Sequence, residues 1–262
     1  MRENTIKTIW SRDEAALGGW LTIPSSFSAE VMAHAGFDWV CIDMQHGLID
    51  YQVAVTMLQA ISMTNAAPIV RVPWNEPGII MKALDAGAYG VIIPMVNSRA
   101  EAEAAVGACR YAPRGYRSYG PSRVPLYAGR DYFQHADDTV LAIVMIETAE
   151  ALEHLDEILS VPGIDACYVG PADLSVSLGL PPRPDHEGGP FAEAIERIAA
   201  ACQKHGVVPG AHAGTPAVAR KRIEQGFRFL EVCADADAMA RSAVADLKAL
   251  RGGGEGRTST YN

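Results

Sequence analysis

Short apolar runs recur along the chain, and most are followed by a segment whose apolar residues have helical spacing. Such runs, separated by helical patterns, are typical of parallel strands. We expect strands at 19–23, 39–43, 67–71, 90–94, 141–146, 166–169, 207–211 and 229–232. We expect the last helix at about 235–250, and a long irregular connection at 110–138.

This alternation predicts an α/β fold, a (β/α)8 TIM barrel. The length of 262 residues is close to the ~250 typical of one such barrel. An open doubly wound sheet that binds a dinucleotide would need GxGxxG after its first strand, and that motif is missing here. We therefore predict a single barrel domain over residues 1–250 and a flexible, glycine-rich tail at 251–262.

Charge and composition narrow the possible partners. The net charge of −9 argues against nucleic-acid binding, so we interpret the Arg- and Tyr-rich stretch at 110–138 as a lid or a subunit contact. No run approaches the ~20 apolar residues of a membrane span. The five cysteines form no CxxC pair, and the N-terminus lacks the apolar core of a signal peptide. We expect a cytoplasmic protein with no membrane partner.

Four polar residues each follow a short apolar run, at or just beyond the end of an expected strand: Asp43, Arg71, Glu147 and Asp173. Catalytic residues of TIM barrels lie at the carboxyl ends of the strands, which gather on one face. The four side chains should therefore converge. His46, three residues after Asp43, belongs to the same expected group.

Glu147 and Asp173 are the expected metal ligands. Burying two carboxylates close together is costly, and a divalent cation relieves the cost for both. Mg²⁺, Mn²⁺ and Co²⁺ accept oxygen ligands of this kind. The alternative is that each carboxylate pairs with an arginine or a helix N-terminus.

Arg71 and His46 would supply the chemistry. Arg71 can bind a carboxylate or a developing enolate oxygen, although it could instead form a structural salt bridge to Glu147 or Asp43. His46 can take a proton, and a nearby carboxylate such as Asp43 would raise its basicity. Among the other histidines, His212 is the one rival, either as a substrate contact or as a support for one.

Lysine placement argues against a Schiff-base mechanism. No lysine ends an expected strand, and barrel aldolases that form a Schiff base need one inside the mouth. The five lysines are Lys7, Lys82, Lys204, Lys221 and Lys248.

Five segments resemble the HpcH/HpaI family of class II pyruvate aldolases. They are Phe37–Gly47, Arg71–Pro73, Tyr111–Gly115, Ile146–Thr148 and Gly170–Ser175, and the resemblance extends from about residue 18 to 250. It implies a (β/α)8 barrel and a homohexamer, built as a trimer of dimers that exchange the C-terminal helix. It also implies a divalent metal cofactor and small 2-oxo acid and aldehyde substrates.

The resemblance also implies a role for each site residue. Glu147 and Asp173 would hold the metal, Arg71 would stabilise the enolate, and His46 would be the general base. Asp85 would raise the basicity of that histidine from a neighbouring subunit. The pyruvate carboxylate would meet the backbone of Gly170, Pro171 and Ala172 and lie beside Asp173.

The implied activity is the reversible cleavage of a 4-hydroxy-2-oxo acid into pyruvate or hydroxypyruvate and an aldehyde, through an enolate bound to the metal. Two alternatives are a citrate-lyase-β or malyl-CoA-lyase-like enzyme and a catalytically silent carboxylate-binding barrel. Two departures from the family pattern bear on substrate preference. Met145 stands where relatives often have Gln, and Gln45 where many have Glu.

Overall fold

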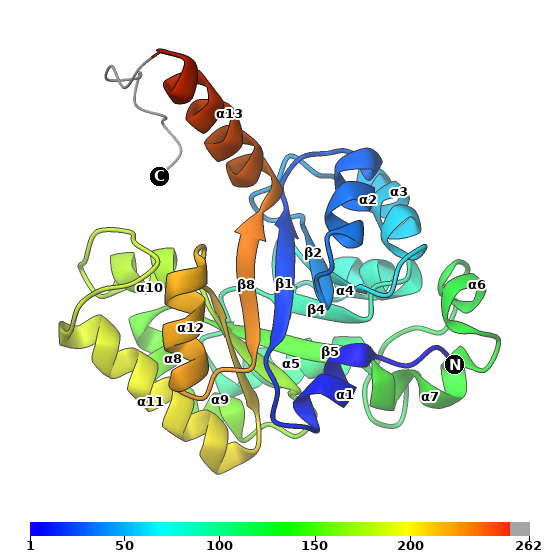
Figure 1. The fold of residues 1–262 in the computed structure, drawn as a ribbon. Helices are drawn as coiled ribbons and strands as arrows, with labels where there is room; N and C mark the ends of the chain where they lie inside the picture. Colours follow the sequence, from blue (N-terminus) through cyan, green and yellow to red (C-terminus); the bar gives the residue numbers. More distant parts are fainter. Residues whose placement is uncertain (252–262) are drawn as a thin grey trace.

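The computed structural model describes residues 1–251. Eight parallel strands close into a barrel in chain order, and helices surround it (Figure 1). The strands are β1 (Ala16–Leu21), β2 (Trp39–Asp43), β3 (Ala67–Arg71), β4 (Gly90–Ile93), β5 (Leu141–Ile146), β6 (Ala166–Val169), β7 (Val208–His212) and β8 (Phe229–Ala234). The predicted (β/α)8 TIM barrel is confirmed.

The outer helices begin largely where the capping signals place them. Ser25 Oγ accepts a hydrogen bond from the Ser28 amide, and Ser98 Oγ from the Glu101 amide, which satisfies amides that the first helical turn leaves open. The helices are α1 (Thr5–Trp10), α2 (Ser26–His34), α3 (Tyr51–Ile61), α4 (Pro77–Asp85), α5 (Arg99–Cys109), α6 (Val124–Ala128), α7 (Tyr132–Thr139), α8 (Ala149–Glu153), α9 (Leu155–Leu159), α10 (Pro171–Ser177), α11 (Gly189–His205), α12 (Pro216–Glu224) and α13 (Asp235–Arg251).

The prediction of an irregular connection over 110–138 is wrong in its second half, which contains α6 and most of α7. Both helices are too short to show a clear helical period, and helices of this length depend on tertiary packing for stability. Tyr132 on α7 supplies that packing: it is 1% exposed, and its hydroxyl accepts a hydrogen bond from Arg117 at 2.9 Å.

Alternation along the strands separates two cores. Trp39, Cys41, Ile143 and Tyr168 point into the barrel, whereas Val40, Ile42, Val144 and Val169 pack against the helices. This period of two is what a pleated strand requires. The N-terminal end is closed by Trp39, whose ring stacks on Phe229 at a centroid distance of 4.1 Å. Aromatic side chains thus fill the interior at that level, and the polar residues predicted for the site lie at the opposite, carboxyl end.

The last helix, α13, leaves the barrel at the carboxyl end of β8 and projects away from it (Figure 1). Its exposed apolar side chains are Met239, Val244, Leu247 and Leu250. The predicted tail at 251–262 lies outside the described residues, apart from Arg251 at the end of α13. Among residues 1–251, no helix is both long and apolar enough to span a membrane.

Candidate active site

Three of the predicted site residues continue the inward-facing series of their strands. Asp43 follows Cys41 by two positions, Arg71 follows Ile69, and Glu147 follows Met145, and all three preceding residues belong to the interior core. Asp43 and Arg71 are also direct neighbours in the register of β2 and β3. The pleat therefore carries a carboxylate, a cation and a second carboxylate to one mouth.

Asp43 and Arg71 form a two-pronged ion pair. Arg71 Nε and Nη2 donate to the two Asp43 oxygens at 2.8 and 2.6 Å, and Trp20 Nε1 donates to Asp43 at 3.2 Å. Burial works to raise the pKa of Asp43, but the bonds from Arg71 outweigh it and hold that pKa below its usual range. Burial likewise works to lower the pKa of Arg71, yet Asp43 keeps it raised. The pair is thus a fixed charge pair at the mouth.

The structural salt bridge considered for Arg71 therefore exists, and its partner is Asp43. It uses Nε and Nη2, and in the described chain the third guanidinium nitrogen, Nη1, has no hydrogen-bond partner. The Arg71 guanidinium carbon also lies 4.9 Å from the centre of the Trp20 ring. A guanidinium held on one edge keeps donors for a substrate oxygen on the other.

Glu147 is the most perturbed carboxylate of the mouth. It is 2% exposed, and its Oε1 accepts a hydrogen bond from the Met95 amide at 2.8 Å. Its pKa is raised to about 7, mainly by burial; the charge of Asp173 also raises this pKa, while the Met95 bond and Arg71 lower it. Met95 has a φ of 55°, an uncommon value for a residue other than glycine, so the backbone there is strained.

Gly170 makes room for Glu147. A Cβ at this position would overlap Glu147 Oε2 and lie 2.9 Å from the Met145 terminal methyl group, so a side chain cannot be accommodated without movement. Asp173 stands three residues later, in the first turn of α10, and is exposed to solvent. The buried carboxylate of Glu147 and the exposed carboxylate of Asp173 therefore lie on the same side of the mouth.

Glu147 and Asp173 together fit a divalent cation. Among residues 1–251, no three or more His, Cys, Asp or Glu side chains are grouped so that they could hold a metal ion by themselves. Such a cation would therefore take its remaining ligands from water and substrate, as Mg²⁺ commonly does. The raised pKa of Glu147 points the same way, because a bound cation would stabilise its ionised form.

His46 lies at the rim and is exposed. Its backbone amide donates to Asp43 Oδ1 at 3.3 Å, and the Gln45 amide donates to the same oxygen at 3.0 Å. Asp43 thus holds the turn that carries His46, while its own oxygens are occupied by Arg71, Trp20 and these amides. The expected influence of Asp43 on the imidazole stays a prediction.

Asp85 is not part of the mouth of its own chain. It stands at the end of α4, where Arg117 Nη2 donates to its Oδ1 at 2.6 Å. It also lines a cavity of about 200 Å³ with Tyr51 and Arg123, between the outer helices and the 110–138 connection. Its expected action on the histidine of a neighbouring subunit stays a prediction.

A second polar cluster inside the barrel includes two residues that the sequence did not single out. Tyr168 on β6 and Glu231 on β8 are both fully buried, and His212 on β7 lies between them. Each of the three falls at an inward position of its strand. The signal for Tyr168 and Glu231 in the sequence is the alternation along β6 and β8, which places both residues at inward positions.

A cavity of about 710 Å³ opens at the same end of the barrel. Its lining comes from Pro171 and Ala172, from residues 182–184, from the end of β7 with the segment that follows it, and from α13; it includes His212, Gly214, Arg183 and Arg241. Pro171 and Ala172, two of the residues expected to meet the pyruvate carboxylate, therefore border a space large enough for a small substrate.

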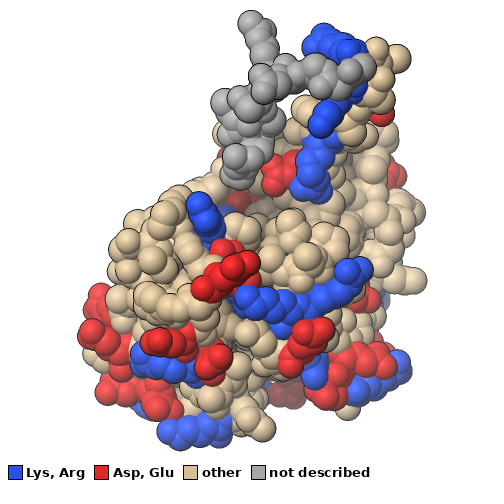
Figure 2. Space-filling model, turned by 60° about the vertical axis from the view of Figure 1, so that its left-hand side comes forward, with Lys and Arg blue, Asp and Glu red and all other residues tan. Residues whose placement is uncertain are grey.

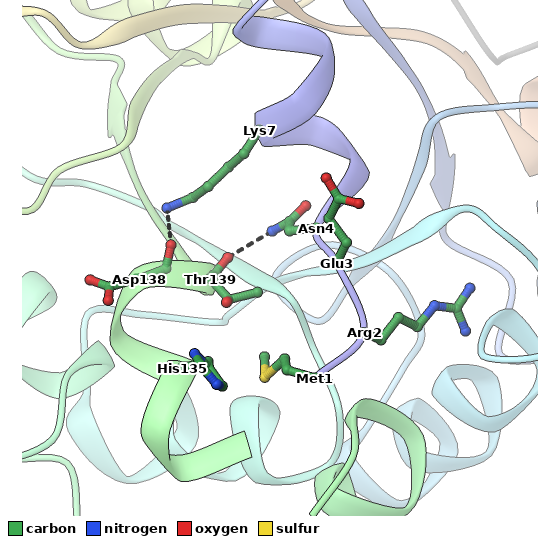
Figure 3. Close-up of a pocket in the computed structure, with 8 residues that line it drawn as sticks. All are labelled: Met1, Arg2, Glu3, Asn4, Lys7, His135, Asp138 and Thr139. Carbon is green, nitrogen blue, oxygen red and sulfur yellow. Dashed lines mark hydrogen bonds between the residues drawn. The ribbon is translucent and has the colours of Figure 1, made fainter. Parts of the chain in front are cut away.

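A separate cavity of about 340 Å³ lies against the N-terminal segment (Figure 3). Lys7 and Asn4 donate there to the backbone carbonyls of Asp138 and Thr139 at 2.6 and 2.8 Å. Its polar groups already bond one another, and it contains none of the predicted site residues.

On the face drawn in Figure 2, acidic and basic side chains are interspersed over the barrel.

The fold and the mouth together define a TIM barrel with two carboxylates, an arginine and a histidine at its carboxyl end. A family model described as HpcH/HpaI aldolase/citrate lyase matches residues 17–242. The chain belongs to the HpcH/HpaI aldolase/citrate lyase family, as its motifs predicted.

Individual relatives agree with this assignment. A hydroxypyruvate/pyruvate aldolase of Rhizorhabdus wittichii is 44% identical, over 94% of this chain and 100% of the relative. A 2-dehydro-3,6-dideoxy-6-sulfogluconate aldolase of Pseudomonas putida is 40% identical, over 92% and 94%. The crystal structure of an HpcH/HpaI aldolase/citrate lyase family protein from Burkholderia cenocepacia superposes with a TM-score of 0.88 at 36% identity, over 95% of this chain and 99% of that one.

Proposed function

We propose that this protein is a class II aldolase, a carbon–carbon lyase that joins pyruvate or hydroxypyruvate to an aldehyde and cleaves the 4-hydroxy-2-oxo acid product. The observation that carries the proposal is the buried Glu147, with its pKa raised to about 7, beside Asp173 and Arg71 at the barrel mouth. The names of the relatives support the predicted aldolase activity.

Glu147 and Asp173 would hold the divalent cation, Mg²⁺ or Mn²⁺ with Co²⁺ as a further candidate. When bound, the cation acts as a Lewis acid that makes the methyl protons of the 2-oxo acid more acidic. Glu147 and Asp173 follow the neighbouring strands β5 and β6, and Arg71 ends β3, so a small 2-oxo acid bound to the cation would meet Arg71 across the mouth.

The chain's own residues divide the remaining work. The Gly170–Ala172 backbone would position the substrate carboxylate. His46 would remove a proton from C3, and Arg71, held in place by Asp43, would donate hydrogen bonds to the enolate oxygen. Charge that develops on that oxygen is best stabilised by donors already fixed in position. The enolate carbon then attacks the aldehyde, whose oxygen takes up a proton.

The assembly we propose is a homohexamer, a trimer of dimers that exchange α13. Its support is the projection of α13 away from its own barrel, with Met239, Val244, Leu247 and Leu250 exposed (Figure 1). In that assembly Asp85 would act on the His46 of a neighbour. We place the protein in the cytoplasm, which is supported by its five cysteines being free thiols.

The experiment that tests the function is exchange of the pyruvate methyl protons with deuterium, followed by NMR without any aldehyde. We expect exchange with Mg²⁺ or Mn²⁺, loss of exchange with a chelator, and loss in His46→Ala. His135→Ala, a change at an exposed histidine on α7, is the matched control and should exchange like the wild type. Absence of exchange with pyruvate and with hydroxypyruvate under every metal would refute the aldolase. A lyase acting on CoA esters or a silent barrel would then take its place.

A further inference from the structure

Glu231 is a buried carboxylate at the mouth that the proposed reaction does not use. It is 0% exposed, its Oε2 accepts a hydrogen bond from the Gly214 amide at 2.8 Å, and its Oε1 has no hydrogen-bond partner in the described chain. Leaving a buried carboxylate oxygen unpaired is costly, and such a group in a folded protein calls for an explanation.

His212 stands opposite Glu231 in the register of β7 and β8. Its Nε2 lies 3.5 Å from Glu231 Oε2, and its Nδ1 lies 3.5 Å from the Tyr168 hydroxyl. Both distances are at the long limit for a hydrogen bond. Together these three side chains have more hydrogen-bonding capacity than they use among themselves, which suits a polar ligand.

The cluster is one side chain away from the enolate-binding arginine. The Trp20 ring stacks on Tyr168 at a centroid distance of 5.8 Å and meets the His212 ring edge-on at 5.1 Å. The same indole donates to Asp43 and lies beside the Arg71 guanidinium. Trp20, which is 2% exposed, therefore contacts both Arg71 and His212, so the two polar groups flank one indole at the mouth.

The cluster also opens to the large cavity. His212 and Gly214 line the space of about 710 Å³, and the His212 side chain is 34% exposed, whereas Glu231 lies buried behind it. An incoming substrate would meet the imidazole first, and the carboxylate would act through it.

We propose that His212, supported by the buried Tyr168 and Glu231, forms the acceptor end of the site and selects aldehydes that carry hydroxyl groups on the carbons that follow the reacting carbonyl. His212 is the specificity-determining contact. Glu231 is a positioning residue that keeps the proton on Nε2, so that Nδ1 can accept a hydrogen bond from the substrate hydroxyl.

This inference rests on the proposed function, since it needs an aldehyde acceptor. In the reaction, a carbon–carbon bond forms between the enolate carbon and the aldehyde carbon, and the aldehyde oxygen takes up the proton. The recognised hydroxyl group is left unchanged.

The test compares kcat/KM for two acceptors with pyruvate as the donor: D-glyceraldehyde, and butanal, which lacks both hydroxyls. We expect the wild type to prefer D-glyceraldehyde. His212→Leu should lower the ratio of the two values by about tenfold or more, because the polar groups behind it lose their partner. Tyr168→Phe and Glu231→Gln, which keep the side-chain size, should each lower it by about threefold.

A matched control comes from a second histidine–carboxylate pair. His205 on α11 lies 2.7 Å from Asp156 on α9, outside the barrel. His205→Leu and Asp156→Asn repeat the same chemical changes there and should leave the ratio unchanged. A general loss of stability would lower both kcat/KM values together and would not change their ratio.

Exchange of the pyruvate methyl protons without aldehyde separates the two proposals. Normal exchange in His212→Leu with a lowered ratio supports the acceptor role. Normal exchange with an unchanged ratio in both His212→Leu and Tyr168→Phe would overturn the acceptor role but not the proposed aldolase function. The cluster would then bind only internal water. Loss of exchange in His212→Leu would also overturn it, because the histidine would serve the donor half. Absence of exchange in the wild type would refute the proposed function itself.

Discussion

Replacing Glu147 by glutamine should stabilise the metal-free protein while abolishing its metal response. Glu147 is 2% exposed and accepts one backbone hydrogen bond, from Met95 at 2.8 Å. Glutamine keeps the size and the accepting carbonyl oxygen but cannot ionise. The substitution therefore isolates the free-energy cost of placing a charge at this point.

The magnitude follows from the raised pKa of Glu147, about 7 against an ordinary 4.5. Above pH 7 the carboxylate is ionised in both the folded and the unfolded chain, so the whole cost of burying the charge is present. As the pH falls through 7, the folded state takes up a proton and the cost is progressively relieved. We expect the variant to exceed the wild type in free energy of unfolding by about 3 kcal/mol at pH 8.5 and by about 2 kcal/mol at pH 6.

The assay is urea unfolding in EDTA at both pH values and one fixed protein concentration, because assembly would make stability depend on concentration. Added Mn²⁺ should stabilise the wild type and leave the variant unchanged. A variant less stable than the wild type at pH 8.5 would refute the reasoning. So would a difference that does not grow between pH 6 and pH 8.5, since Glu147 would then be ionised and satisfied without a metal.

The other predictions concern the groups around Glu147, and pyruvate methyl exchange measures each. Gly170→Ala should cut metal-dependent exchange at least about tenfold at unchanged circular dichroism, since the added Cβ overlaps Glu147 Oε2; normal exchange would contradict this. Arg71→Lys should slow exchange about 100-fold because lysine cannot make the paired bonds to Asp43. A decrease in the exchange rate of less than about threefold would show that the pairing is unimportant. Trp20→Phe, which removes the 3.2 Å bond to Asp43, should slow exchange about fivefold. A decrease as large as that of Arg71→Lys would assign the indole a larger role.

The barrel and the convergence of its main site residues could be predicted because both depend on local regularities. A period of two along each strand decides which side chains point inward, and parallel strands bring their carboxyl ends together. Asp43, Arg71 and Glu147 therefore reach one mouth for reasons visible in the chain. Helix starts at Ser25 and Ser98 follow equally local rules of capping.

Pairings between distant segments could be found only in the folded chain. Asp85, at the end of α4, accepts a hydrogen bond from Arg117, which lies 32 residues away in a connection expected to be irregular. Helices α6 and α7 are short and owe their stability to such contacts.

The same contrast explains the mouth. The sequence by itself determined that Glu147 would be buried, because six apolar residues precede it on its strand. Tertiary structure decided that its neighbours would be the Met95 amide, which lowers the pKa of Glu147, and Asp173, which raises it. It also decided that Gly170 would leave space for the Glu147 side chain. Burial follows from a local pattern, whereas the energy of a buried charge depends on whichever groups the fold brings within a few ångströms.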